Sequence, residues 1–385
     1  MKSNYKKLGP YIRQVDVRNV EDKKENLLGV SVQKKFILSI ANTVGTDFTK
    51  YRVVRKNQFT YIPDTSRRGD KIGIALLTDY DEGLVSNVYT VFEIIDVTKL
   101  IPEYLMLWFS RPEFDRYARY KSHGSVREIF DWEQMCNVEL PIPPLEEQKR
   151  IVDEYNVINK RIALKKKKNE NLEEQIKCLF NNSFGKVIKL TSKLPEGWIL
   201  DKAQNIYNIS VGKTPPRKRL DCFTTNQVGT KWVSIADMGS NGMFILKTSE
   251  NLTEEAIKEF KVKLIPKNTV IYSFKMTNGR TSITTEECAT NEAIAHFGTD
   301  DISLSLYAYC YLNLFRFSDL GSTLSITEAV NSTIIKSMPF VILPQKVLDN
   351  FAMSVIPIFK QIKLNLCEIM LSVDILDSFL SMLSL

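Results

Sequence analysis

Apolar residues recur with a seven-residue period along two stretches of the chain, residues 145–184 and 345–384. Alternating steps of four and three residues keep such positions on one face of an α-helix, so each stretch is predicted to form one long helix. Helices of this length normally pack on another helix, which favours a pair, although each could pack only on its own domain. The first stripe is Ile151, Tyr155, Ile158, Ile162, Lys165, Asn169, Leu172, Ile176 and Leu179, and the second is Phe351, Val355, Ile358, Ile362, Asn365, Ile369, Ser372, Leu376 and Phe379.

Polar residues interrupt both stripes: Lys165 and Asn169 in the first, and Asn365 and Ser372 in the second. Polar residues at such positions weaken helix packing but can fix the register between two helices. Pro357 also lies within the second stretch, where a proline costs about 3 kcal/mol in a helix interior. The second helix is therefore expected to kink at Pro357 or to begin its regular part near it.

The two helical stretches close two copies of a larger pattern, about 200 residues apart, and repeats of this size determine the architecture. Several segments match in the same order in both halves. The matches are Lys56–Tyr61 with Lys267–Tyr272, Ser86-Asn87 with Thr290-Asn291, Tyr104–Phe109 with Cys310–Phe315, and Pro144 with Pro344. The chain is therefore predicted to contain an internal repeat.

The segments outside the helices, residues 1–144 and 185–343, contain short strand-like runs separated by Gly, Asn and Asp. Examples are Val88–Ile95, Lys231–Ile235 and Thr269–Phe274. Runs of this kind favour an α+β domain with a curved sheet over alternating βαβ units. Two such domains agree with the length of 385 residues, which exceeds a single domain core.

The composition indicates a globular protein: 44% of residues are hydrophobic and 25% are charged. Fifty-two Lys and Arg against 45 Asp and Glu give a net charge of +7, which permits a polyanionic partner without requiring one. The run Lys165–Lys168 is interpreted first as a solvated helix face. Because no secretory signal and no run of 18 apolar residues is visible, a cytoplasmic protein without a membrane span is expected.

The sequence contains no pattern that indicates catalysis. We find no G-x-x-x-x-G-K-[ST] phosphate loop, no G-x-S-x-G elbow and no H-E-x-x-H motif. The two histidines, His123 and His296, have no partner motif and are interpreted as packing or surface residues, and the six cysteines form no C-x-x-C pair. A metal site, a disulfide framework and a bound cofactor are not expected.

Basic loops at matching places in the two halves indicate recognition of a polyanion. Arg and Lys neutralise phosphates or donate to guanine, and Asn pairs with adenine edges. A solvated turn remains the alternative for any one loop, but the coincidence at repeat-related positions favours binding. The predicted DNA contacts are Arg67, Arg68 and Lys71 in the first half, and Lys213, Arg217, Lys218, Asn278 and Arg280 in the second.

The sequence around the first helix resembles a known family. Leu140–Val152 (LPIPPLEEQKRIV), followed by a long helix, looks like the conserved region of specificity (S) subunits of type I restriction-modification systems. The segments Gly212–Pro216, Trp232–Gly239 and Leu264–Phe274 resemble that family's target recognition domains. Two departures stand out: the second helix opens Leu343–Leu348 without the Leu-Glu-Glu-Gln run, and residues 1–144 match the generic opening motifs poorly.

The resemblance implies an α+β architecture with two target recognition domains and a pseudo-twofold internal repeat. The domains would be residues 1–144 and 185–343, separated by spacer helices 145–184 and 344–385 that form an antiparallel coiled coil. It implies double-stranded DNA as a partner, two adenine-methylating modification subunits and a motor-nuclease restriction subunit. S-adenosylmethionine and ATP would belong to those partners, with no cofactor and no catalytic residue in this chain.

The predicted function is to give a type I complex its DNA specificity, with each domain reading half of an asymmetric bipartite target. The helix pair would set the length of the spacer between the half-sites. Two other functions remain open from the sequence: a DNA-modifying enzyme with an unrecognised site, and a stand-alone DNA-binding regulator. The bases read and the spacer length do not follow from the sequence.

Overall fold

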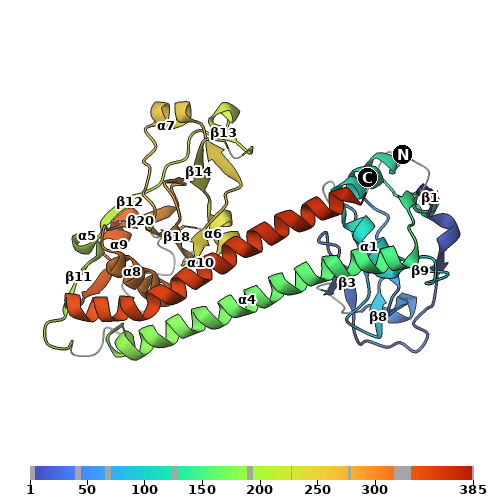
Figure 1. The fold of residues 1–385 in the computed structure, drawn as a ribbon, viewed down its shortest axis with the longest axis horizontal. Coiled ribbons are helices and arrows are strands. Elements are labelled where there is room, and N and C mark those ends of the chain that lie inside the picture. The colour runs from blue at the N-terminus through green and yellow to red at the C-terminus, as the bar shows by residue number, and fades with distance from the viewer. Residues whose placement is uncertain are drawn as a thin grey trace. The chain divides into compact units, whose positions relative to one another are not determined.

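A computed structural model describes residues 5–39, 45–65, 71–123, 128–188, 194–226, 228–275, 279–315 and 331–383. The chain divides into two compact units, which we call unit 1 (residues 1–163 and 371–385) and unit 2 (residues 164–370). Two long helices, α4 (Leu145–Ile188) and α10 (Gln345–Met382), each contribute one part to unit 1 and the other part to unit 2 (Figure 1).

Unit 1 is built on a four-stranded antiparallel sheet with the order β2-β9-β6-β7. Its strands are β2 (Ile12–Val15), β9 (Thr90–Ile94), β6 (Phe59–Tyr61) and β7 (Ile74–Leu76). Alternate side chains of the sheet pack on helices α1 (Pro102–Ser110) and α2 (Pro112–Lys121), because successive residues of a strand face opposite sides. In this core the rings of Phe59 and Phe92 stack with centroids 4.8 Å apart.

The described part of unit 1 also contains three strand pairs and three short helices. The strand pairs are β1 (Tyr5–Lys7) with β10 (Glu139–Pro141), β3 (Leu28–Val30) with β4 (Phe36–Leu38), and β5 (Arg52–Arg55) with β8 (Glu82–Val85). The short helices are η1 (Gly9–Tyr11), η2 (Phe48–Lys50) and α3 (Trp132–Cys136).

Unit 2 is built on a five-stranded sheet with the order β12-β20-β17-β18-β15. Its strands are β12 (Asn208–Val211), β20 (Ile294–Gly298), β17 (Val270–Ser273), β18 (Thr281–Thr284) and β15 (Phe244–Ile245). One face packs on α8 (Ile302–Leu314), where Tyr307 and Tyr311 are buried. The hydroxyl of Tyr307 donates to the backbone oxygen of Val341 at 3.0 Å, so a polar atom of this core is satisfied.

A second sheet of unit 2 has the order β13-β16-β14-β19. Its strands are β13 (Phe223–Thr224), β16 (Glu250–Leu252), β14 (Thr230–Val233) and β19 (Ala289–Thr290), and a separate pair joins β11 (Ile199–Lys202) to β21 (Pro339–Ile342). The remaining helices are α5 (Ala203–Ile206), η3 (Leu220–Cys222), α6 (Ile235–Asn241), α7 (Glu254–Phe260) and α9 (Ser332–Lys336).

The two units repeat the same order of elements, which confirms the predicted internal repeat. The sheet order β2-β9-β6-β7 of unit 1 recurs as β12-β20-β17-β18 in unit 2. The pairs β1-β10 and β11-β21 also correspond, and each repeat leads from a final strand into a long helix. The mixed sheet and helix content agrees with the α+β prediction.

The turns before β9 and β20 correspond one residue away from the match read in the sequence. The amide of Tyr89 donates to the carbonyl of Ser86 at 3.2 Å, and the amide of Ile294 donates to the carbonyl of Asn291 at 3.3 Å. Ser86 therefore corresponds to Asn291, whereas the sequence match pairs it with Thr290. Sequence similarity does not show which carbonyl accepts the hydrogen bond that closes a turn. The backbone hydrogen bond therefore determines which residues are equivalent.

The helix stripes predicted from the seven-residue period form the contact between α4 and α10. Every position of both stripes is buried or half-buried. In unit 2 the ring of Phe180 lies 5.6 Å from that of Phe351, and in unit 1 the ring of Tyr155 lies 6.2 Å from that of Phe379. Numbers on α10 fall as those on α4 rise within unit 2, so the helices run antiparallel there.

A polar layer interrupts the helix contact within unit 2. Lys165 donates from Nζ to Oδ1 of Asn365 at 3.0 Å and forms an ion pair with Glu368 at 3.0 Å. Asn365, which is fully buried, donates from Nδ2 to Oδ1 of Asn169 at 2.7 Å. Because these partners occur at one level of the pair, they favour one register over others.

Helix α10 begins at Gln345 and continues through Pro357, so of the two alternatives expected there a start near Pro357 is wrong, and a kink stays a prediction. Pro357 lies on the exposed side of the helix. Water can there solvate the carbonyl that loses its amide partner, which reduces the penalty of an interior proline. Among the described residues, no helix is both long and apolar enough to cross a membrane.

Candidate nucleic-acid interface

The strand register of unit 1 brings three segments to one end of its main sheet. Val15, the last residue of β2, pairs with Val91. Tyr61, the last residue of β6, pairs with both Thr90 and Ile74, where β9 and β7 begin. The segment after β2, the connection between β6 and β7, and the turn before β9 therefore emerge together. We call this end of each main sheet the loop end.

Unit 2 has the same loop end. Val211 pairs with Ala295 at the end of β12, and Ser273 pairs with Ile294 at the end of β17. The segment 212–219, the connection between β17 and β18, and the turn 291–294 therefore emerge together. Five of the eight predicted DNA contacts are described in these segments: Lys71, Lys213, Arg217, Lys218 and Arg280. Arg67, Arg68 and Asn278 lie outside the described residues.

Gly212 starts the basic segment of unit 2 in close contact with the neighbouring turn. Its amide donates to the carbonyl of Ile294 at 3.1 Å, and the amide of Lys213 donates to that of Thr290 at 2.9 Å. A Cβ atom on Gly212 would lie 2.1 Å from the carbonyl oxygen of Asn291. Glycine is therefore required there, since any side chain would separate the segment from the turn.

Arg217 is engaged with the second sheet of unit 2. Its guanidinium lies 4.4 Å from the ring centroids of both Phe223 and Trp232, and its Nη1 pairs with Oε2 of Glu250 at 2.7 Å. Trp232 also donates from Nε1 to the carbonyl of Lys213 at 3.3 Å. Cation–π stacking and the ion pair fix the middle of the segment. Contact between Arg217 and DNA stays a prediction.

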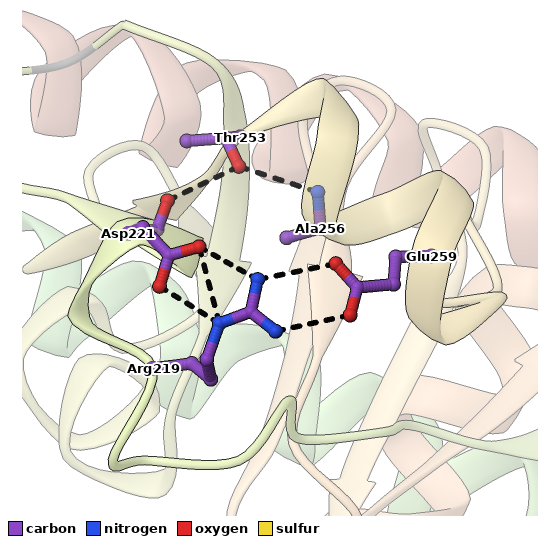
Figure 2. Close-up of polar contacts among 5 residues, drawn as sticks. All are labelled: Arg219, Asp221, Thr253, Ala256 and Glu259. Carbon is purple, nitrogen blue, oxygen red and sulfur yellow. Dashed lines mark hydrogen bonds and ion pairs between the residues drawn. The ribbon is translucent and has the colours of Figure 1, made fainter.

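Arg219 fixes the far end of the same segment. Figure 2 shows its guanidinium between the carboxylates of Asp221 and Glu259, with contacts of 2.7 Å from Nη2 and 3.0 Å from Nη1. Hydrogen bonds from Arg219 lower the pKa of Asp221 below its usual value. Thr253 Oγ1 accepts from the amide of Ala256 at 3.3 Å and so caps α7. These contacts tie η3 to α7.

Lys213 and Lys218 keep exposed side chains on the anchored segment. Neither ammonium group forms an ion pair with a residue that the structure describes. Lys275, at the start of the connection between β17 and β18, is also exposed. A rigid backbone that presents lysines to solvent suits contact with phosphates, because little ordering is then required on binding.

Arg280 is half-buried and turned toward helix α6. Its Nη1 donates to the carbonyl of Ile235 at 2.6 Å. A Cβ atom on Gly239 would lie 2.7 Å from this nitrogen, so the guanidinium packs directly against the helix. Arg280 therefore connects the β17–β18 connection to α6, and a direct role in binding remains a prediction.

Lys71 of unit 1 lies beside a buried ion pair. Nζ of Lys34 lies 2.9 Å from Oδ1 of Asp115, and the same oxygen accepts from the amide of Ile72 at 3.1 Å. Burial lowers the pKa of Lys34, the Asp115 carboxylate opposes this, and the charge of Lys71 adds to the lowering. Asp115 thus fixes the backbone at Ile72, near the end of the β6–β7 connection. The side chain of Lys71 is exposed.

Comparison with known proteins finds similar sequences among specificity subunits. Residues 2–174 match the type I restriction modification DNA specificity domain. The type I restriction enzyme MjaIX specificity subunit of Methanocaldococcus jannaschii is 25% identical over 309 residues, covering 74% of this chain and 69% of that protein. The type I restriction enzyme HindI specificity subunit of Haemophilus influenzae is 21% identical over 413 aligned positions, covering 88% of each. The chain is therefore similar to type I specificity subunits along most of its length.

A solved structure of a specificity subunit shows the same fold. The type I restriction-modification system S subunit from M. genitalium matches with a TM-score of 0.55 at 13% identity, covering 99% of this chain and 96% of that chain. At this identity the likeness concerns the fold alone. It agrees with the paired long helices and the two sheet-bearing units described above.

Several loop-end residues of this chain were not predicted from its sequence as site residues. In unit 1, Arg52 donates from Nε to Oδ1 of Asp16 at 2.8 Å and from Nη1 to the carbonyl of Asn87 at 2.5 Å. In unit 2, Thr214 donates from Oγ1 to Oε2 of Glu292. The repeat-related turns are the signal that the sequence offers, but a matched turn indicates duplication and does not show which side chains it exposes.

His296 is a packing residue, as the sequence predicts. It is 1% exposed and its two ring nitrogens lie 2.8 Å from Oγ of Ser210 and 2.7 Å from Oγ1 of Thr290. Burial, with a smaller effect from the charge of Lys263, lowers its pKa to about 4. His123 is exposed, and within the described ranges no group of His, Cys, Asp and Glu could hold a metal ion.

Proposed function

We propose that this chain reads DNA for a type I restriction-modification complex. Each unit reads one half of an asymmetric bipartite target with its loop end. The observation that carries the proposal is the recurrence of one basic loop end in both units, with Lys71 exposed in unit 1 and Lys213 and Lys218 exposed in unit 2. Lysines of this kind neutralise phosphates, and neighbouring side chains select bases.

The helix pair is proposed to set the distance between the two half-sites. An α-helix rises 1.5 Å per residue, so the 44 residues of α4 correspond to about 66 Å, longer than one turn of B-DNA. We infer that residues 1–144 and 185–343 act as recognition domains, and residues 145–184 and 344–385 as spacer helices. Because the recognition domains differ in sequence, the two half-sites differ as well.

The chemistry is proposed to reside in partner subunits. Two adenine-methylating modification subunits and a motor-nuclease restriction subunit would bind S-adenosylmethionine and ATP, and this chain would act in the cytoplasm without a catalytic residue.

Base-modification sequencing of a host that carries the system tests the proposal directly. The expected result is one bipartite methylated motif that disappears when this chain is deleted and returns when it is restored. Methyl transfer from labelled S-adenosylmethionine by the purified chain alone would instead identify an enzyme. A chain that purifies without stoichiometric methyltransferase, and leaves the methylome unchanged on deletion, would instead be a regulator.

A further inference from the structure

The two loop ends carry different side chains at one equivalent turn position. The turns Ser86–Tyr89 and Asn291–Ile294 are each closed by a hydrogen bond from the fourth residue to the first. Their second residues are Asn87 in unit 1 and Glu292 in unit 2, and both side chains are exposed. The same backbone therefore presents an amide in one unit and a carboxylate in the other.

Arg52 holds the turn of unit 1. The side-chain amide of Asn87 is exposed to solvent. Nη1 of Arg52 donates to the carbonyls of Asn87 and Tyr89, each at 2.5 Å, and Nε pairs with Asp16 at 2.8 Å. The two bonds to the turn are accepted by backbone oxygens and therefore leave the side chain of Asn87 unengaged. The exposed side-chain amide of Asn87 makes no hydrogen bond within the described part of the chain, so its donor and acceptor are available together.

The turn of unit 2 is held by the basic segment, and Glu292 lies among cations. The backbones of Gly212 and Lys213 bond to Ile294 and Thr290 on either side of the turn, and Thr214 donates to Oε2 of Glu292. The hydrogen bond from Thr214 lowers the pKa of Glu292 most, and the charges of Lys275 and Arg217 add to the lowering. The carboxylate is therefore ionised at neutral pH.

An ionised carboxylate at a phosphate-binding end requires an explanation, because it repels phosphate. A carboxylate does find a partner on a base edge: the exocyclic amino group of cytosine donates in the major groove, with no acceptor of the same base beside it. An exposed asparagine amide matches adenine, which offers an amino donor and the N7 acceptor together. The side chain at this turn position therefore matches adenine in unit 1 and cytosine in unit 2.

We propose that Asn87 and Glu292 are the repeat-related base-reading residues of this chain, with Asn87 selecting an adenine in one half-site and Glu292 selecting a cytosine in the other. The inference rests on the proposed function, since it assigns bases to the same two loop ends. It also accounts for asymmetry of the target through one structural position, occupied differently in two copies of one fold.

Base-modification sequencing with the intact complex in a host tests this assignment. Glu292→Gln keeps an oxygen that can accept from Thr214, removes the charge and adds an amide donor. The expected result is loss of the preference for cytosine at one position of one half-site, by roughly tenfold to a hundredfold, with a shift toward adenine. Asn87→Asp should change one position of the other half-site only, from adenine toward cytosine.

Two controls separate a reading role from a structural one. Glu255→Gln removes a charge from exposed α7 of the same unit and should leave the motif unchanged. Thermal unfolding of each purified variant reports whether it is folded. The assignment is overturned if a complex with folded Glu292→Gln chain still methylates only the wild-type motif. It is also overturned if that complex loses base preference equally at every position of the motif. If Glu292→Gln does not fold, Asn87→Asp decides by the same criteria, and the assignment is overturned if neither variant shifts a base.

Failure of the assignment differs from failure of the proposed function. If the wild-type chain directs no bipartite motif, the proposed function is wrong and the assignment falls with it. If the wild-type chain directs a motif that both variants preserve, the proposed function stands and only the assignment is overturned.

Discussion

Lys165 and Asn365 lie 200 residues apart, occupy equivalent places in the two stripes, and bond to each other, with Nζ donating to Oδ1 at 3.0 Å. Contact between equivalent positions is the property of an antiparallel pair at its centre of symmetry. The polar layer of the helix pair therefore lies where a position of one stripe contacts the equivalent position of the other stripe. A shift by one heptad would separate these groups, so the layer favours a single register.

Asn365→Ala should destabilise the helix pair because the substitution leaves buried polar partners without bonds. Asn365 is fully buried and bonds to Lys165 and Asn169. Loss of such bonds with burial of an unpaired polar group costs about 1 to 3 kcal/mol. The measurement is urea unfolding of the purified complex or chain. Lys360→Ala, on the exposed face of α10, should change the free energy of unfolding by less than about 0.5 kcal/mol. Equal effects of the two substitutions would contradict the role of the layer.

Stability should fall on mild acidification through protonation of His296. Its pKa is about 4 in the folded chain and 6.5 when exposed, so the unfolded chain binds more protons between these values. The stabilising contribution of the neutral ring is complete above pH 6.5 and is lost as the pH falls toward 4. By pH 5 the loss is about 2 kcal/mol.

The measurement for His296 is the free energy of unfolding at pH 7.5 and pH 5, compared with His296→Gln. A glutamine can bond to Ser210 and Thr290 and does not titrate, so the variant should show a smaller decrease between these pH values. A decrease of the same size in both proteins would show that other groups, such as carboxylates, account for the acid sensitivity.

Lys218→Gln should weaken binding of any duplex by a similar factor and reduce its dependence on salt. Each phosphate neutralised contributes about 0.9 to the slope of log affinity against log salt concentration. The expected slope is therefore lower by about 0.9 than that of the unchanged chain. Titration of a fluorescent duplex at several salt concentrations measures this slope.

Lys346→Gln in the first turn of α10 is the matched control for Lys218→Gln, since both remove one exposed positive charge. The control should leave the slope unchanged. A slope that responds to both substitutions equally would indicate a general effect of net charge and not a phosphate contact at Lys218.

The sequence predicted the elements that depend on long or repeated patterns. Eighteen stripe positions hold one phase over two stretches, so the helix pair followed from periodicity, and the repeat followed from the matched order of segments. The level at which Asn169 contacts Asn365 depends on the packing of one helix against the other. It is therefore a property of the assembled pair.

The sequence predicted that the loop ends carry basic residues, but not which of these residues are engaged by other side chains. A basic residue in a loop has the same local sequence whether its charge forms no ion pair with the described residues, as in Lys218, or contacts two rings and a carboxylate, as in Arg217. The partners of Arg217 come from positions 223, 232 and 250, which are brought together by the second sheet. Which side chains remain available at a loop end is thus decided by tertiary contacts.

Shortening the helix pair should change the spacer that the complex accepts and leave both half-sites unaltered. The contact of Tyr155 with Phe379 shows that residues 156–162 of α4 and 372–378 of α10 lie at similar levels of the pair within unit 1. Deleting both heptads removes seven residues from each helix, which is about 10.5 Å or roughly three base pairs, and retains the polar layer. The apolar stripe keeps its phase because a heptad is two turns of a coiled coil.

The preferred spacer should shorten by about three base pairs, as measured by base-modification sequencing. Activity should also decrease, because removing three base pairs rotates one half-site by roughly 100° relative to the other, whereas deleting a heptad rotates the helix by only about 20°. The DNA between the half-sites must therefore change its twist by the difference between these two angles for both half-sites to be bound. The matched control replaces exposed residues of the same two heptads with Ala at constant length, which should preserve the spacer. A deletion variant that is folded and active on the original spacer would show that the distance between half-sites is set outside the helices.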